Sequence, residues 1–260
     1  MTPVGEKSSK IKYREMEEII NLSAWDPMEV QGDKALTVSI IISVAGMILV
    51  LGFLARTGSG LPTANSSLVW ALFSALSVLG ASATLFPSRC SRSKDLPSEL
   101  DEGRYTMIDG VRLVHGHHPS CGHFSGHEFT LGRKSYCAGC FGLLLGSLIS
   151  LAVASSHFIF GIRFPLFSGY MGVASIIFGL FYVPVFTPRE PWLRVLCNLL
   201  LVTGFALTLT GVDNVGYLGF DLTVVGLCVF WILTRIQLSR WSHDAVCAVC
   251  GEPCELNMPH

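Results

Sequence analysis

The chain alternates between long apolar runs and polar segments. Each apolar run is close to the roughly 20 residues that a helix needs to cross the hydrocarbon core of a bilayer. The six runs are 35–55, 67–86, 141–160, 165–186, 193–212 and 215–238. Only Gly211, Asp213 and Asn214 separate the last two runs, so five spans are an alternative. The pattern predicts an all-α integral membrane bundle of about six transmembrane helices.

The composition of the chain agrees with a membrane protein. Half of the 260 residues are hydrophobic and 14% are charged, whereas soluble domains carry about 25% charged residues. Much of the surface is therefore expected to face lipid. The net charge of -1 offers no basic face of the kind that nucleic-acid binding requires. We expect the lipid bilayer as a partner and exclude nucleic acid, while no motif points to a particular protein partner.

The distribution of positive charge predicts the orientation. With six spans and an inside N-terminus, only Arg56 and Arg163 of the 18 Lys and Arg residues lie outside. Positive charge near span ends is retained in the cytoplasm, so we expect a multi-pass cell-membrane protein with cytoplasmic N- and C-termini. The predicted segments are a cytoplasmic polar leader (1–34), transmembrane helices 1 and 2 (35–86), a cytoplasmic His/Cys-rich metal-binding loop (87–140), transmembrane helices 3 to 6 (141–238) and a cytoplasmic Cys-rich tail (239–260).

Two β-hairpins are predicted within the cytoplasmic loop. Asp109-Gly110 separates two strand-like runs, 104–108 and 111–114, and Asp-Gly is a strong signal for a two-residue hairpin turn. A second hairpin is expected from strand 128–131 through 132–134 to 135–136. Cys137 then lies directly at the exit of the second hairpin. The fold class therefore includes a small metal-stapled β-hairpin module between helices 2 and 3.

The segment 115–140 contains five histidines and three cysteines. Cysteines in the reducing cytoplasm are more often metal ligands than disulfides. Cys137-x2-Cys140 has the spacing of a metal knuckle, and tetrahedral zinc needs four ligands. The favoured ligand set and its reserves are Cys121, His127, Cys137 and Cys140, with His117, His118 and His123 in reserve. The mixture of His with Cys favours Zn²⁺ over iron, which is the alternative.

A second ligand cluster lies in the tail. Its members are spaced like a zinc knuckle followed by a turn and are His243, Cys247, Cys250 and Cys254. One His and three Cys suffice for a closed zinc site. Two independent sites are the favoured interpretation. The alternative is that the tail lends ligands to the loop.

Small and polar residues within the apolar runs add further expectations. Cys197 and Cys228 are predicted to be small core residues, and His157 is expected at the interface. Asp221 either marks an ion or proton path or lies at the interface. Four small residues at a spacing of four predict a smooth helix face for close packing, and they are Gly142, Gly146, Ser150 and Ala154.

The segment 117–146, HHPSCGHFSGHEFTLGRKSYCAGCFGLLLG, resembles the DUF2085 family of predicted integral membrane proteins of unknown function. The resemblance rests on a Cys, a Phe, a Gly and a Cys-Ala-x-Cys-x-Gly knuckle that opens a transmembrane helix. The matching residues are Cys121, Phe129, Gly132, Cys137, Ala138, Cys140 and Gly142. Gly139 stands where an Arg is usual, and HHPSCGH replaces a Cys-His start. The resemblance implies a shared metal site and supplies no reaction.

Three functions follow from these patterns. The favoured one is a binding, scaffolding or metal-sensing protein with cytoplasmic zinc modules, because closed sites need no open coordination position. The first alternative is a metal-dependent membrane enzyme, a hydrolase or redox protein, with Glu128 as general base beside a metal-bound water. The second alternative is a metal ion transporter, which would require ionisable groups near the middle of several spans. The sequence contains no Walker-type loop, nucleophile elbow or dinucleotide fingerprint.

Overall fold

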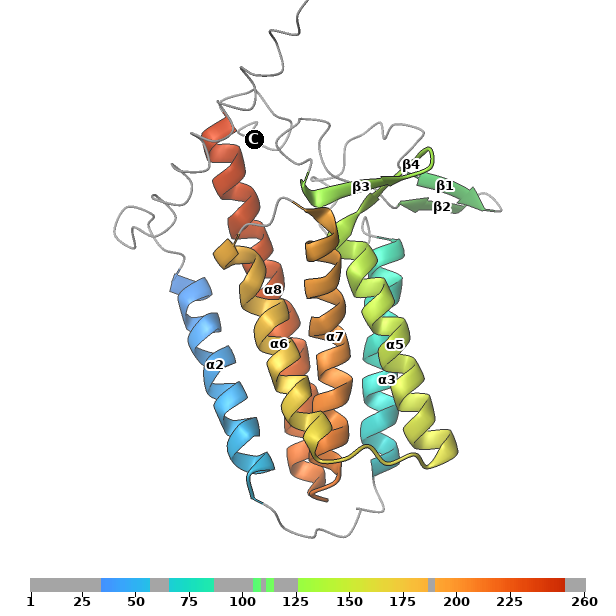
Figure 1. Cartoon of the computed structure of the whole chain (residues 1–260), viewed down its shortest axis with the longest axis vertical. Helices are drawn as coiled ribbons and strands as arrows, with labels where there is room; N and C mark the ends of the chain where they lie inside the picture. The colour runs from blue at the N-terminus through green and yellow to red at the C-terminus, as the bar shows by residue number, and fades with distance from the viewer. Residues whose placement is uncertain are drawn as a thin grey trace, which may run out of the picture.

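The computed structural model describes residues 34–56, 66–86, 105–108, 111–114, 126–186 and 190–250. Within these ranges the helices lie side by side in one bundle, with the strands at one end of it (Figure 1). The helices are α2 (Lys34–Leu54), α3 (Ser66–Leu85), α5 (Ala138–Phe160), α6 (Phe167–Phe186), α7 (Pro191–Asp213) and α8 (Leu218–Cys250). The strands are β1 (Tyr105–Ile108), β2 (Val111–Val114), β3 (Glu128–Leu131) and β4 (Lys134–Cys137).

Five of the described helices are long and apolar enough to span a membrane. They are α2, α3, α5, α7 and the Leu218–His243 part of α8, whereas α6 contributes the shorter apolar stretch Phe167–Tyr182. Large apolar side chains cover the outside of the bundle, and Ile41, Leu79 and Ile159 are each more than 60% exposed. Such a surface is stable in lipid and not in water. The predicted all-α bundle of apolar helices is confirmed at this level.

Helix α7 forms the centre of the bundle. In its apolar window 72% of the residues are buried, against 33% or less in the other four candidate spans. The contacts of α7 with α6 and with α5 are the two most extensive contacts between elements. The predicted small-residue face of α5 is buried and consists of Gly142, Gly146, Ser150 and Ala154. A Cβ atom on Gly142 would lie 2.3 Å from the carbonyl oxygen of Val195 in α7, so only glycine permits this approach.

Both predicted hairpins form. In the first, Ile108 pairs with Val111, which leaves Asp109-Gly110 as the two-residue connection. In the second, Leu131 pairs with Lys134, so Lys134 belongs to the strand and not to the turn. Gly132 has a φ of +66°, the left-handed conformation that such a turn requires.

The second hairpin sits on the end of the bundle. Phe129 of β3 is 7% exposed and forms a small core with Ala138 of α5 and Val195 of α7. The ring of Trp192 lies 4.5 Å from that of Phe129, measured between centroids. This apolar contact fixes the position at which β4 ends and α5 begins.

Helix α8 differs from the sequence prediction in its length. The predicted run ends at 238, whereas the helix continues to Cys250. The polar segment after 238 contains neither Gly nor Pro before Gly251, so nothing in it stops a helix. A turn separates α7 from α8, with Gly216 at a φ of +79°. The last two runs are therefore separate helices.

Candidate metal centre

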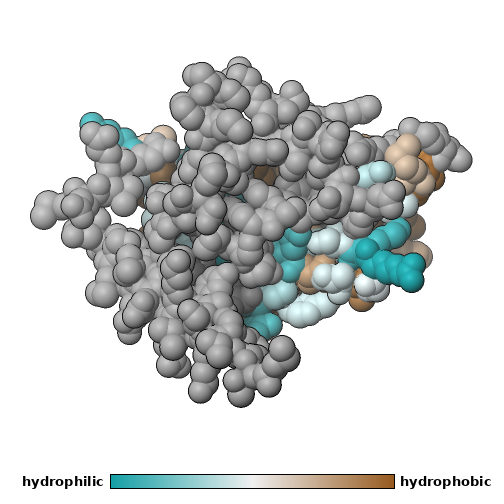
Figure 2. Space-filling view, turned by 90° about the horizontal axis from the view of Figure 1, so that it is seen from above, coloured by the Kyte–Doolittle hydropathy of each residue, from teal (hydrophilic) through white to brown (hydrophobic). Residues whose placement is uncertain are grey.

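A cavity of about 160 Å³ lies where the second hairpin meets the bundle. Its lining combines two thiols, two imidazoles and two guanidinium groups. The residues that line it are His127, Cys137, Gly139, Cys140, Leu143, Arg194, Asn198, Arg235, Ile236, Ser239 and His243. Figure 2 views the molecule from this end, where hydrophilic and apolar surface lie next to each other on the described residues.

The two cysteines of the predicted knuckle stand at the start of α5. Cys137 ends β4, precedes the first residue of α5 and is 4% exposed. Cys140 follows in the first turn of the helix, and both cysteines are free thiols close enough to share a hydrogen bond. The prediction that Cys137 lies at the exit of the second hairpin is confirmed.

The structure brings the loop and the tail together through two histidines. His127 precedes β3 and is 8% exposed, whereas His243 lies near the end of α8. Their ring centroids are 5.0 Å apart, and the rings meet edge to face. The sequence favoured separate sites for these two residues. Their contact instead supports the alternative in which the tail lends a ligand to the loop.

Two arginines in the cavity wall are functional candidates that the sequence reasoning did not select. Arg235 of α8 is 8% exposed, and its Nε donates a hydrogen bond to Oδ1 of Asn198 at 3.2 Å. Arg194 of α7 has a buried Nε without a hydrogen-bond partner among the described residues. Arg194 is also close enough to Cys137 to attract its thiolate electrostatically. In the sequence, both arginines lie inside apolar runs, and a charged residue in such a run usually marks a functional site.

Glu128, the predicted general base, does not belong to the described lining of the cavity. It lies half-buried on β3, where its carboxylate accepts a hydrogen bond from Ser135 at 2.8 Å. The hydroxyl partner explains its position on the hairpin without a catalytic role.

For the remaining predicted ligands the structure describes either the backbone alone or nothing. The backbone of Cys247 and Cys250 belongs to α8, whereas their side chains lie outside the described residues. Also outside the described residues are His117, His118, Cys121, His123 and Cys254. Among the residues that are described, no three His, Cys, Asp or Glu side chains are grouped closely enough to hold a metal ion as they stand.

The chemistry of the donors fits zinc. Two thiols and two imidazoles from Cys137, Cys140, His127 and His243 are the ligand types of a closed tetrahedral zinc site. All four line one cavity. Comparison with protein-family models, with curated proteins and with solved structures found no match to this chain. The resemblance to DUF2085 accordingly stays an expectation from the sequence.

Proposed function

We propose that the chain is a multi-pass cell-membrane protein that binds zinc at its cytoplasmic end and serves a binding, scaffolding or metal-sensing role. The observation that carries the proposal is the shared cavity of His127, Cys137, Cys140 and His243. These residues come from the hairpin module, from the start of α5 and from the end of α8. A site assembled from three segments senses their relative position, because the ion binds only when all three are in place.

The proposed centre is single and is shared by loop and tail. His243 takes the position that the sequence analysis gave to Cys121, which stays an alternative ligand outside the described residues. Zinc binding requires that the thiols lose their protons. Arg194 lies close enough to Cys137 to attract its thiolate.

The charge distribution supports a cytoplasmic position for this end of the bundle. Arg194 and Arg235 line the cavity at the hairpin end. Arg56 and Arg163, the two residues that the sequence analysis placed outside, follow the C-terminal ends of α2 and α5. Both of those helix ends lie away from the hairpins (Figure 1). The positive-inside rule then favours the hairpin end as the cytoplasmic one.

Elemental analysis of the full-length protein purified in detergent tests the proposal. We expect about one zinc ion per chain for the shared centre, consistent with one closed site of four ligands. Cys137→Ser and His243→Ala should each remove most of it, while Cys228→Ala, in the apolar core, should retain it. Folded wild-type protein without metal contradicts the proposal. Full metal content in His243→Ala contradicts only the sharing between loop and tail.

The two arginines favour a metal-dependent membrane enzyme as the second candidate. They place positive charge beside the proposed metal, and no carboxylate is among the described residues that line the cavity. Such a site suits a substrate with an anionic group. Arg194→Gln would separate the two roles, because an enzyme would lose activity at unchanged metal content. A scaffold would keep both its metal and its partner.

A further inference from the structure

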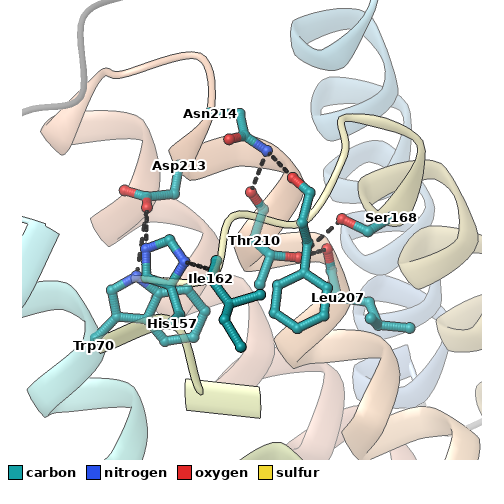
Figure 3. Close-up of polar contacts among 9 residues, drawn as sticks. Trp70, His157, Ile162, Ser168, Leu207, Thr210, Asp213 and Asn214 are labelled. Atoms are coloured by element: carbon teal, nitrogen blue, oxygen red, sulfur yellow. Dashed lines mark hydrogen bonds and ion pairs between the residues drawn. The ribbon is translucent and has the colours of Figure 1, made fainter. Parts of the chain in front are cut away.

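At the end of the bundle opposite the hairpins, three helices each contribute a His or Asp side chain. His157 lies in the last turn of α5, Asp213 ends α7, and Asp221 lies in the first turn of α8. Asp213 is 6% exposed and Asp221 is fully buried at 0%. Asp221 is thus enclosed by protein. Figure 3 shows His157 and Asp213 facing each other beside Trp70.

One proton is held between His157 and Asp213. Nδ1 of His157 lies 3.1 Å from the carbonyl oxygen of Ile162, and this oxygen only accepts, so Nδ1 carries a hydrogen. Nε2 lies 2.9 Å from Oδ2 of Asp213, a distance that requires one hydrogen between the two atoms. Whichever atom carries it, the pair is neutral as a whole. The indole N–H of Trp70 also donates to Oδ2, at 3.5 Å.

Asp221 has no such compensation. Both of its carboxyl oxygens, together with Oδ1 of Asp213, are buried without a hydrogen-bond partner among the described residues. Asp221 is close enough to Asp213 for their charges to interact. The neutral His157–Asp213 pair offers it no net positive charge. Because an unpaired buried carboxylate is costly, the arrangement calls for a ligand that removes the charge.

The described surroundings place no cation beside Asp221. Helices α3 and α6 contain no charged residue, and Tyr170 of α6 is half-buried against the core. Lys34 of α2 lies at the other end of its helix, and Arg56 and Arg163 are exposed. Within the described ranges, Asp213 is the titratable neighbour whose carboxyl group interacts with Asp221. No described trio of His, Cys, Asp or Glu is close enough to hold a metal ion.

We propose that His157, Asp213 and Asp221 form a proton-binding site in which Asp221 binds and releases a proton beside the neutral His157–Asp213 pair. The proton comes from hydronium in the surrounding water. The new O–H bond removes the negative charge of Asp221, and release returns the proton to water. No further reactant takes part. The site is separate from the proposed metal centre, because it lies at the other end of the bundle (Figure 1).

Infrared difference spectroscopy on the full-length protein in lipid nanodiscs tests this site. We expect the wild type to show the carbonyl stretch of a carboxylic acid without a hydrogen bond, at higher wavenumber than that of a solvated acid. The band should vanish reversibly as pH is raised and should be absent from Asp221→Asn. The matched control is Glu190→Gln, which removes an exposed carboxyl group at the hairpin end and should leave the band unchanged.

A second variant tests whether the residues form one site. Asp213→Asn should move the midpoint of the band's titration, because the neighbouring carboxyl group is lost. Identical spectra for wild type and Asp221→Asn at every pH would overturn the proposal, and an unchanged midpoint in Asp213→Asn would overturn the shared site. Should Asp221→Asn not fold, wild-type protein labelled with ¹³C at the aspartate carboxyl replaces it. The band must then move to lower wavenumber, and a band that stays in place refutes the assignment to an aspartate.

Discussion

At the hairpin end, two thiols, two imidazoles and two arginines surround a cavity of about 160 Å³. At the opposite end, Asp213 and Asp221 are buried with one histidine, and three of their carboxyl oxygens have no partner among the described residues. The first set offers the soft donors that a metal ion bound by thiolates would use. The second offers Asp221, a buried carboxyl group without a compensating charge. Under the two proposals above, the bundle would support a different chemistry at each end.

The same three helices supply both ends. Helix α5 contains Cys140 near its start and His157 in its last turn. Helix α7 contributes Arg194 to the cavity and ends at Asp213, while α8 begins close to Asp221 and ends beyond His243. Rigid packing of α5 on α7 thus fixes the geometry of the two ends together.

Removal of the thiols should have the largest effect. Structural zinc contributes about 10–16 kcal/mol of apparent binding free energy in zinc-finger peptides. We expect the double variant Cys137→Ser, Cys140→Ser to lose several kcal/mol of unfolding free energy. The loss should not exceed about 10 kcal/mol, the lower limit of that range. A chelator should lower the thermal midpoint of the wild type and leave that of the variant unchanged. If the chelator lowered the thermal midpoint of both proteins equally, these two thiols would not bind the metal.

Breaking the ion pair at the opposite end should have the next largest effect. Removal of one partner of a buried charge pair costs about 3–5 kcal/mol, and His157 and Asp213 are 14% and 7% exposed in their side chains. We expect His157→Ala to lower the unfolding free energy by about 3 kcal/mol at unchanged zinc content. The double variant His157→Ala, Asp213→Asn should recover part of the loss. A variant that also lost zinc would show that the two ends are not independent.

Packing between the ends gives a third test. A Cβ atom on Gly146 would lie 2.9 Å from the carbonyl oxygen of Leu199 and from Cβ of Val202, so a larger side chain must push α5 away from α7. We expect Gly146→Val to cost about 1–3 kcal/mol and to weaken zinc binding and the infrared signature of Asp221 together. Gly226→Val on α8, where nothing lies within 4 Å, is the control. An effect confined to one end would contradict rigid coupling through α5 and α7.

Local patterns in the sequence predicted much of this architecture, and contacts between distant segments escaped them. The apolar runs marked every described helix, and Asp109-Gly110 marked the first hairpin, because both signals depend on neighbouring residues. The length of α8 was missed since the end of an apolar run is not a helix stop. The contact between His127 and His243 was an alternative only, because no spacing relates residues so far apart. Asp213 was interpreted as a break between runs, and only the fold shows that it faces His157.

The smallest expected effect concerns Glu128, whose substitution separates a scaffold from an enzyme at the hairpin end. Its carboxylate accepts one hydrogen bond from Ser135, and such a bond contributes about 0.5–1.5 kcal/mol. Because Glu128 does not belong to the described cavity lining, we expect Glu128→Gln to keep its full zinc content and to lose about 1 kcal/mol or less. Ser135→Ala removes this hydrogen bond altogether and should cost at least as much in thermal unfolding, because the amide oxygen of a glutamine still accepts it. Loss of zinc in Glu128→Gln alone would instead place the carboxylate beside the metal. That result would favour an acid–base role for Glu128 and hence an enzyme. The hairpin end would then use a carboxyl group in its chemistry, as the opposite end does.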